Sequence, residues 1–449
     1  MSAARSTAPG RARSGSAARG EARAPRAGRN ASEPPALQYR VARRTDVEAL
    51  IDLSLRAYRV SSAEARREFY TDHPRFELKD VRVGERDGML VASLVLYPFQ
   101  AYVRGERLAV TGIGSVAVSP EHRRRGIAEA LLRSTLDEMR ERGDAWSMLY
   151  PFRGDFYRRF GWGLVETPTL LSVPPSTLPA ADEARHVRRA RTADRPLVQA
   201  LYERVARDRG HFMLARRPAW WERRLWGYEG EWLVYERARG QVEGYLQLQV
   251  DSSDGPWKLV ITVNEFMAAT AEAHRGLAGY LHGQRDQAVE VVMAAAADAA
   301  WPAQLSDAAN LRGEMKLGVL RSAGHAGYGA MLRVLDVKAA LEQLPVDPEA
   351  RGDVVLEVRD PMLPANAGPW RVTAREGGLE VRPEAAASNA QKSPRLTCTA
   401  DVLASVVAGA LSPVRAVEAG LLESTHGAAE RVDPWFRARA VFLMPMNAF

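Results

Sequence analysis

One short sequence pattern occurs twice in this chain, and it constrains the fold more than any other feature. Residues 39–46 are YRVARRTD, and residues 187–194 are VRRARTAD. Each copy leads into a stretch in which apolar residues recur at the spacing of a helix. A unit that recurs in this way is the signature of a duplication. The sequence therefore predicts two related domains in tandem.

The segment around the first copy predicts a mixed α/β layer of the α+β type. Its order is a strand, two helices, three strands, a helix and a strand, with expected strands at 39–42, 81–83, 89–103, 108–118 and 147–150. The segment around the second copy repeats the later part of this order, with expected strands at 232–236, 241–250, 258–265 and 289–294. A third α/β unit is expected to begin near Met331.

Chain length agrees with this division, because 449 residues correspond to about three domains of about 150 residues each. We predict a disordered tail over 1–36, a first domain over 37–184, a second over 185–330 and a third over 331–449. The final residues, from Ala440 to Phe449, are mostly apolar. We therefore expect a packed C-terminus, which is unusual for a chain end.

Simple counts exclude several classes of protein. The single cysteine, Cys398, rules out an intramolecular disulfide and any site built from clustered cysteines. The eight histidines show no HExxH or comparable ligand spacing, so no metal is expected. Glu290 and Asp298 interrupt the most apolar run, and the N-terminus lacks the apolar segment of a secretory signal. We therefore expect no transmembrane helix and a cytoplasmic protein.

The basic character of the chain is concentrated at its beginning. The net charge is +7, and residues 1–36 alone contain seven arginines against two glutamates. This segment holds almost no apolar side chain larger than alanine, so it cannot bury enough surface to fold. It could bind nucleic acid or an anionic surface, but a solvated tail is the simpler interpretation. The nearly neutral remainder does not favour a polyanionic partner.

The most informative local pattern is SVAVSPEHRRRGIA, residues 115–128. A strand runs into a turn of three arginines, and a helix is expected to start at Gly126. Free backbone N–H groups at a helix N-terminus bind anions, and arginines add forked donors. Glycine permits close approach of the backbone. The pattern therefore favours a pyrophosphate site, although a basic surface turn that merely caps a helix would look similar.

This pattern resembles the acetyl-coenzyme A motif of the GCN5-related N-acetyltransferase (GNAT) superfamily, Arg/Gln-x-x-Gly-x-Gly/Ala. The motif is met by Arg123, Gly126 and Ala128. In addition, residues 154–163, GDFYRRFGWG, resemble the Tyr-x-x-Phe-Gly-Tyr/Trp-Gly signature of the Enhanced intracellular survival (Eis) family. The resemblance covers about residues 37–449. It implies two GNAT-like domains, the second degenerate, a sterol-carrier-like third domain and a homohexamer.

The resemblance also implies residue roles. The tyrosine of the signature, Tyr157, would be the general acid, and the carboxylate of the last residue, Phe449, would be the general base. Acetyl-CoA contacts would fall on Val116, Ala117, Val118, Arg123, Arg124, Arg125, Gly126, Ile127, Ala128, Glu129, Phe152 and Arg153.

The same residues make chemical sense without the family. A tyrosine of pKa about 10 can protonate a thiolate of comparable basicity, and a carboxylate fixed in a pocket can remove a proton through water. Tyr157 is also surrounded by aromatic residues and could simply pack, and Phe449 could simply be a buried end. Trp220, Trp221 and Trp226 are either core residues or the lining of an acceptor cavity.

Two departures from the family pattern concern ligands. Residues 273–278, AHRGLA, have alanine where the second domain would need the first basic residue of the motif, so no second cofactor site is expected. No acidic residue lies near Phe449 in sequence to hold a polycation. Asp52, Glu64 and Glu68 are the acidic candidates from the first helices.

From these observations we expect an acetyl-CoA-dependent N-acetyltransferase that acts by direct transfer on amines of small cationic molecules, such as aminoglycosides or polyamines, or on lysine side chains. The alternative is a non-catalytic acyl-CoA or lipid-binding protein that retains the fold. Association with nucleic acid through the arginine-rich tail is the third hypothesis.

Overall fold

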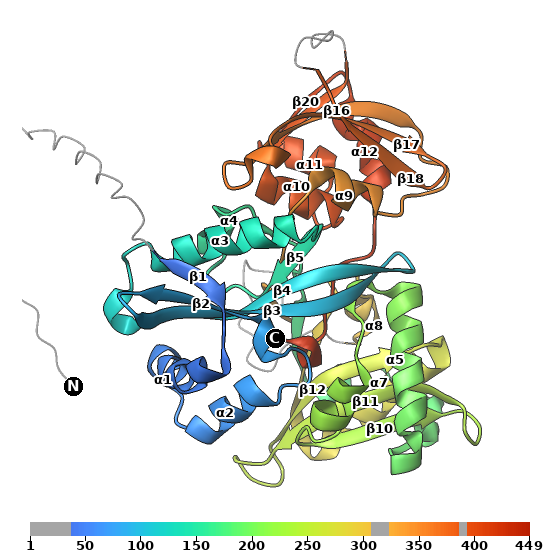
Figure 1. Cartoon of the computed structure of the whole chain (residues 1–449). Coiled ribbons are helices and arrows are strands. Elements are labelled where there is room, and N and C mark those ends of the chain that lie inside the picture. Colours follow the sequence, from blue (N-terminus) through green and yellow to red (C-terminus); the bar gives the residue numbers. More distant parts are fainter. Residues whose placement is uncertain (1–36, 307–322, 386–392) are drawn as a thin grey trace, which may run out of the picture.

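Three sheets, each accompanied by helices, make up the computed structural model of the protein (Figure 1). The structure describes residues 37–306, 323–385 and 393–449, and the predicted tail lies outside them. Within these ranges, no helix is both long and apolar enough to cross a membrane.

The first sheet has the strand order β1-β2-β3-β4-β5-β15-β6, and β9 pairs with β3 at its side. Helices cover both faces of this sheet. Successive side chains of β3 point to opposite faces: Tyr97 belongs to the apolar cluster that includes Leu50 of α1, and Leu96 to the cluster that includes Leu131 of α3. The elements are β1 (Gln38–Val41), α1 (Val47–Tyr58), α2 (Ala63–Thr71), β2 (Val81–Arg86), β3 (Met89–Val103), β4 (Glu106–Val118), α3 (Ile127–Glu141), β5 (Trp146–Leu149), α4 (Gly154–Arg158), β6 (Gly163–Leu164), β9 (His211–Leu214) and β15 (Met331–Val334).

The second sheet has the order β14-β7-β13-β12-β11-β10-β8. As in the first domain, its central pairs are antiparallel except for one, β12 with β13, which matches the parallel pair β4 and β5. The elements are β7 (Thr169–Val173), β8 (Val187–Arg189), α5 (Arg195–Arg209), α6 (Pro218–Trp220), β10 (Glu231–Glu236), β11 (Val242–Asp251), β12 (Leu259–Ala268), α7 (Ala271–His282), β13 (Ala288–Ala295), α8 (Trp301–Gln304) and β14 (Gly324–Ala326).

The duplicated sequence pattern forms the same ion-pair network in both domains. Arg40 binds Asp46 at 2.7 Å and Glu85 on β2 at 2.9 Å. Its counterpart Arg188 binds Asp194 at 2.7 Å and a glutamate of β10 at 2.7 Å. In each copy the arginine thereby joins the first strand, the start of the first helix and the neighbouring strand. The predicted duplication is confirmed.

The two domains exchange their last strands. β7 lies in the stretch 37–184 that the sequence assigns to the first domain, but it pairs with β13 of the second sheet. β15 opens the stretch 331–449 assigned to the third domain, but it pairs with β5 and β6 of the first sheet. Thus β7 lies before, and β15 after, the stretch of 185–330 that the sequence assigns to the second domain. Residues 169–173 and 331–334 therefore join the two sheets covalently in both directions.

The third domain has a five-stranded sheet, β18-β17-β16-β19-β20, with helices on one side. A cavity among its apolar side chains measures only about 20 Å³, and the large side chains of Trp435 and Phe436 line it. The elements are α9 (Val337–Glu342), β16 (Gly352–Arg359), β17 (Gly368–Arg375), β18 (Gly378–Pro383), β19 (Arg395–Thr399), α10 (Ala400–Val407), α11 (Pro413–Glu418), β20 (Leu422–Thr425) and α12 (Ala428–Phe436).

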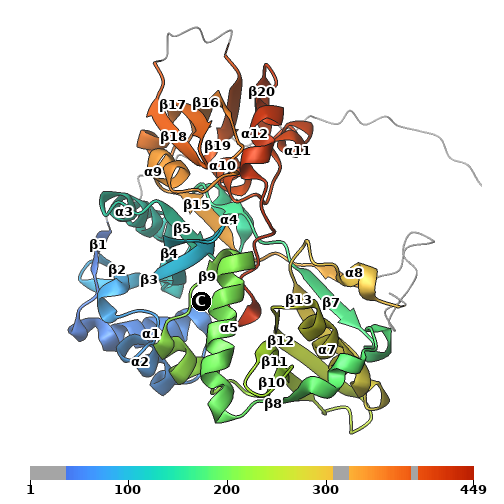
Figure 2. The same ribbon diagram turned by 90° about the vertical axis from the view of Figure 1, so that its right-hand side faces the viewer.

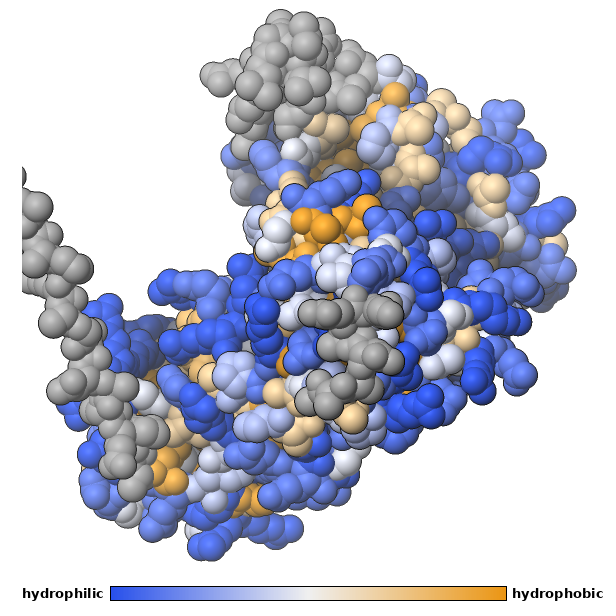
Figure 3. All heavy atoms as spheres, turned by 90° about the horizontal axis from the view of Figure 1, so that it is seen from above, coloured by the Kyte–Doolittle hydropathy of each residue, from blue (hydrophilic) through white to orange (hydrophobic). Residues whose placement is uncertain are grey.

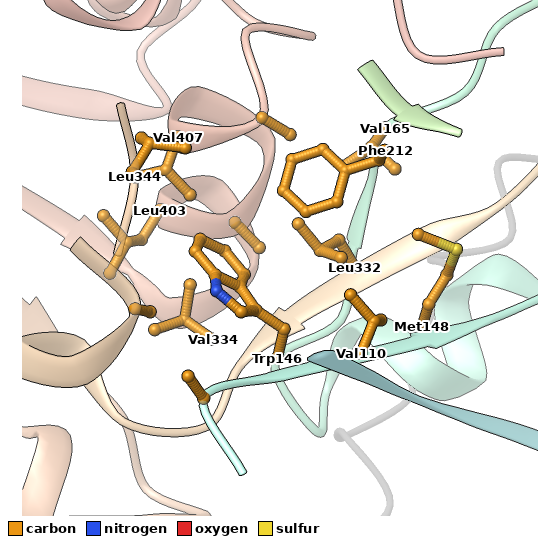
Figure 4. Packing of buried hydrophobic residues seen from close by; sticks show 14 of the residues in the cluster. Val110, Trp146, Met148, Val165, Phe212, Leu332, Val334, Leu344, Leu403 and Val407 are labelled. Carbon is orange, nitrogen blue, oxygen red and sulfur yellow. The ribbon is translucent and has the colours of Figure 1, made fainter. Parts of the chain in front are cut away.

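A continuous apolar core joins the first and third domains, whereas the second sheet has a separate core of its own. Trp146 of β5 is fully buried, and around it lie Phe212 of β9, Leu332 of β15 and Leu403 of α10 (Figure 4). Viewed from the third domain, the surface carries apolar residues as separate groups among hydrophilic ones (Figure 3). The chain then leaves the third domain and ends in the middle of the molecule, next to the first and second domains (Figures 1 and 2). The C-terminus is packed, as the sequence predicts.

Candidate functional site

The basic turn after β4 forms an open N-terminus for helix α3. Arg124 and Gly126 both have positive φ, 59° and 78°, so the chain reverses sharply before the helix. Gly126 tolerates this conformation without strain. It is the N-cap of α3, and no side chain caps the helix there. The first N–H groups of α3 therefore remain available for an anionic ligand.

The three arginines of the turn differ in their contacts. Arg123 donates to the backbone oxygens of Ala57 at 2.9 Å and Val118 at 3.3 Å, so it ties the turn to the end of α1. Arg124 lines the adjacent cavity, whereas Arg125 is exposed and is not part of its lining. The turn therefore combines one structural arginine with free cationic charge.

Strand β4 diverges from β5 just before the turn. The two strands pair in parallel only from Thr111 to Ile113 of β4. A bulge follows, in which Ser115 has a φ of 52° and the register with β3 shifts. A bulge bends its strand and leaves a residue unpaired. From Gly114 to Val118, the edge of β4 that faces away from β3 has no strand partner among the described residues. An extended ligand could pair with that edge.

Tyr157 lies on the short helix α4 and is 3% exposed. Phe152 and Phe156 meet its ring edge to face, at 5.6 and 5.0 Å between ring centres, and Trp162 lies at 6.1 Å. Burial raises the pKa of Tyr157 above its usual value. Its hydroxyl group is therefore protonated at neutral pH and can act as a proton donor.

The last residue, Phe449, lies against β4. Its ring packs on Tyr97, Phe99 and Tyr150, with ring centres 4.7 to 5.5 Å away. Two glycines of β4 make room for it: a Cβ atom on Gly112 would lie 2.9 Å from the Phe449 ring, and one on Gly114 would lie 3.4 Å from its carboxyl carbon. The terminal carboxylate is therefore placed beside the point where β4 leaves β5.

One cavity of about 780 Å³ connects these features. Of the residues that the sequence singles out, twelve line it: Val116, Ala117, Val118, Arg123, Arg124, Gly126, Ile127, Ala128, Glu129, Phe152, Tyr157 and Phe449. Arg125 and Arg153 do not, and Arg153 instead pairs with Asp155 on the surface at 2.9 Å. A bent strand edge, an open helix N-terminus, a protonated tyrosine and a carboxylate thus share one space.

The cavity also contains residues that sequence patterns did not indicate. Tyr58 at the end of α1 and Tyr150 after β5 line it. His122 and Arg159 also line it; they lie within the two sequence patterns, which gave them no role. No motif marks the two tyrosines, because each follows an ordinary apolar element. Tyr150 contacts the ring of Phe449, and burial raises its pKa well above the usual value.

The acidic candidates lie elsewhere. Asp52 binds Arg56 on the surface of α1 at 2.9 Å, and Glu64 and Glu68 are exposed on α2. None of the three lines the cavity. Among the described residues, Glu129 is the one acidic side chain in its lining, and it binds Arg133 at 3.0 Å. The terminal carboxylate is the other negative group that faces this space.

The second domain lacks the anion-binding turn. Strand β12 passes into α7 with only two residues between them, and Thr270 caps the helix by accepting from the N–H of Ala273 at 3.1 Å. Gly276 therefore lies in the second turn of α7, where a Cβ atom would be 2.5 Å from the Tyr235 ring. At the start of the same helix, His274 packs against Trp301, with ring centres 4.9 Å apart. No pyrophosphate site can form there.

A second cavity of about 840 Å³ lies between the first and second domains. Trp220 and Trp221 line it, and so do Arg75, Arg107 and Arg217. Trp226 instead packs on Trp232, with ring centres 4.6 Å apart. Two of the three tryptophans therefore face a cavity, and the third belongs to the core. Among the described residues, no group of three or more His, Cys, Asp or Glu side chains could hold a metal ion.

Comparison with protein families divides the chain into three domains. Residues 38–165 and residues 212–334 each match an acetyltransferase (GNAT) domain, and residues 337–444 match a sterol carrier protein domain.

Relatives and solved structures match almost the whole chain. An uncharacterized N-acetyltransferase of Streptomyces avermitilis is 30% identical over 428 residues, which cover 88% of this chain and 98% of the relative. An uncharacterized N-acetyltransferase of Streptomyces coelicolor is 29% identical over 384 residues, 80% and 88% of the two chains. Among crystal structures, a GCN5-related N-acetyltransferase from Anabaena variabilis has a TM-score of 0.77 at 20% identity, and Eis1 from Mycobacterium abscessus has 0.72 at 23%. Each alignment covers 92% of this chain and 100% of the other.

Proposed function

The chain belongs to the N-acetyltransferases of the GNAT superfamily, and on that premise we propose that it transfers the acetyl group of acetyl-CoA directly to an amine of a small cationic molecule or a lysine side chain. We also infer that it is an Eis-like member, on the basis of its three-domain plan and the signature over 154–163. The observation that carries the proposal is that the strand edge, the basic turn, Tyr157 and Phe449 all line one cavity.

The residues present fit acetyl-CoA. The open N-terminus of α3 and the cation of Arg124 suit a pyrophosphate, and the unpaired edge of β4 from Gly114 to Val118 suits an amide-bearing arm. Exposed Phe152 lies beside Tyr157 and would cover the bound molecule from the solvent side. Acetyl-CoA supplies the reactive thioester, and this chain supplies its orientation.

Two groups of the chain would move protons. The Phe449 carboxylate is proposed to take the proton of the ammonium group, directly or through a water molecule, so that the amine becomes a nucleophile. The Tyr157 hydroxyl is proposed to give its proton to the departing sulfur atom. Because burial raises the pKa of Tyr157, the hydroxyl group carries that proton throughout the neutral range. Holding both substrates in line supplies much of the remaining acceleration.

The charges of the cavity lining suit an acceptor that carries one amino group rather than several. The cavity lining offers Glu129 and the terminal carboxylate as its negative groups, against Arg123, Arg124 and Arg159. A polycation would gain little from that lining, so aminoglycosides and polyamines remain a prediction of the family resemblance.

The test is an acetylation assay over polyamines, aminoglycosides, simple alkylamines and lysine peptides. We expect Tyr157→Phe to lower kcat by about 10²-fold, in the range that general acid catalysis supplies. Exposed Tyr228→Phe serves as its control. A chain extended by one glycine beyond Phe449 displaces the terminal carboxylate and should show a similar loss of kcat. Phe449→Leu keeps the terminal carboxylate in its place and should retain part of the activity. Wild-type rates for both Tyr157→Phe and the extended chain would refute the residue roles. Tight acetyl-CoA binding without acetylation of any amine would instead favour a binding protein.

A further inference from the structure

The C-terminal segment is attached to the second domain through the side chain of Asn447. This side chain is 1% exposed. Its Oδ1 accepts from Nε of Arg216 at 2.8 Å, and its Nδ2 donates to the hydroxyl oxygen of Tyr202 at 2.9 Å and to the carbonyl oxygen of Leu443. Every polar atom of the amide therefore has a partner, which fixes the position and the orientation of the residue two places before Phe449.

Arg216 is itself held by a buried ion pair. Its Nη1 atom donates to Glu265 at 3.0 Å and its Nη2 atom donates to the other carboxylate oxygen, and the two side chains are 1% and 0% exposed. Tyr245 also donates to Glu265, at 3.0 Å. Burial disfavours the charge of Arg216, but the adjacent carboxylate outweighs this and raises the pKa of Arg216 above its usual value. All donors of the guanidinium group that face Asn447 and Glu265 are thus used.

Glu265 lies on strand β12 at the position where the corresponding strand of the first domain, β4, leaves its parallel neighbour. This strand pairs with β13 only as far as Val263, and a bulge in its register with β11 follows. In the first domain, β4 pairs with β5 only as far as Ile113, and a bulge follows there too. In the first domain, the portion of β4 after this bulge faces the proposed cofactor. In the second domain, the corresponding portion of β12 carries Glu265, which binds Arg216.

The first domain holds the same segment from the opposite side. Arg75 donates from Nη1 to the carbonyl oxygen of Asn447 at 3.1 Å and from Nη2 to that of Ala448 at 2.7 Å. Its guanidinium group stacks 3.8 Å above the Trp220 ring of the second domain. The backbone before Phe449 is therefore clamped between the two domains, and a shift of one residue would break all of these bonds.

A buried ion pair is a poor source of stability, because the loss of hydration offsets the attraction, and apolar replacements are often at least as stable. What hydrogen-bonded charges provide is a defined direction. We propose that Asn447, Arg216 and Glu265 are positioning residues for the terminal carboxylate, so that the second domain, which has no cofactor site of its own, serves to place the general base. This inference rests on the proposed function, in which that carboxylate takes the proton of the amine.

Asn447→Leu tests the inference, because it keeps the branched shape of the side chain and removes its hydrogen bonds. We expect kcat at pH 7 to fall by about 10²-fold, the range for general base catalysis, while the KM for acetyl-CoA stays within twofold. The loss should shrink as the pH approaches 9.5, because an alkylamine of pKa near 10 then reaches the site partly unprotonated. A purely structural defect would not depend on pH in this way. Met267→Leu is the matched control, because Met267 is buried on β12 in the apolar cluster that includes Tyr202 and Met446.

A milder variant guards against a failure to fold. Tyr202→Phe removes one acceptor of the Asn447 amide and keeps the ring under Arg216. We expect kcat to fall several-fold at pH 7 and the KM for acetyl-CoA to stay unchanged. The loss of kcat should again become smaller as the pH approaches 9.5. The inference would be overturned if Tyr202→Phe had the kcat of the wild type and Asn447→Leu had the kcat of Met267→Leu. It would also be overturned if Asn447→Leu lost the same factor of kcat at pH 7 and at pH 9.5. If the chain extended beyond Phe449 is inactive in that case, the proposed base stands and only the positioning role falls. If the extended chain is fully active, the proposed base itself is wrong.

Discussion

Gly163 links the third domain to the turn that carries Tyr157, and replacing it with alanine should lower activity without touching the cavity. Gly163 lies on β6, six residues after Tyr157. A Cβ atom there would lie 2.0 Å from the carbonyl oxygen of Asp401 and 2.5 Å from Oγ of Ser405, both on α10 of the third domain. The same Ser405 donates to the carbonyl oxygen of Leu164 at 3.0 Å.

The size of the effect follows from these distances. Real Cβ atoms do not approach other heavy atoms within 3.0 Å, so β6 and α10 must separate by about 1 Å. Because the obstacle is backbone, no side-chain rotation can relieve it. Such overpacking costs about 1–3 kcal/mol. A displacement of about 1 Å in a catalytic group can lower a rate by about 10²-fold. We therefore expect Gly163→Ala to lower both the melting temperature and kcat, the latter by about 10- to 100-fold.

Gly154→Ala is the matched control. Gly154 is the first residue of α4, the helix that carries Tyr157, and a Cβ atom added there would meet nothing within 4 Å. Thermal unfolding followed by circular dichroism and steady-state kinetics with one amine would compare the variants. The reasoning fails if Gly163→Ala has the melting temperature and kcat of Gly154→Ala. It also fails if both variants lose activity equally.

Three further predictions concern other parts of the molecule. Since burial raises the pKa of Tyr157 above 10, kcat should show no decline between pH 8 and pH 10; an inflection near pH 9 that is absent from Tyr157→Phe would contradict this. The third domain should bind no fluorescent fatty acid or sterol at micromolar concentration. Its cavity of about 20 Å³ is little more than the roughly 10–15 Å³ that a single water molecule needs. Saturable binding to the full chain that excess acetyl-CoA does not displace would refute this. Burial lowers the pKa of His73 to about 3. Below pH 6.5 the unfolded chain therefore takes up a proton that the folded chain does not, and the free energy of unfolding falls as the pH falls. His73→Phe should reduce the slope of this free energy against pH by up to about 1.4 kcal/mol per pH unit, as measured by urea unfolding between pH 6 and pH 4.

The parts of the fold that could be predicted from sequence depend on neighbouring residues. The duplicated pattern binds within itself, from Arg40 to Asp46 and from Arg188 to Asp194. The turn before Gly126 is likewise visible, because a strand, three arginines and an apolar helix follow one another directly. Local patterns of this kind survive any arrangement of the remaining chain.

The parts that could not be predicted depend on distant partners. β7 and β15 are short apolar strands that would fit either sheet, and only the packing of the whole molecule decides which one each joins. Arg216 and Glu265 look like ordinary charged residues in sequence, yet both are fully buried. Nothing local indicates that the first meets Asn447 across the domain boundary. The tyrosines of the cavity, Tyr58 and Tyr150, are hidden for the same reason.

The two copies differ at the loop that follows the bent central strand. Both domains keep a bulge where the central strand leaves its parallel neighbour, after Ile113 in β4 and after Val263 in β12. In the first copy the strand continues into the basic turn, so the bent edge opens onto a helix N-terminus that suits an anion. In the second copy the strand joins α7 almost directly, and the bent portion carries Glu265 instead. The second copy therefore has the bend without the anion site, and its bent portion carries the carboxylate that holds Arg216 against Asn447.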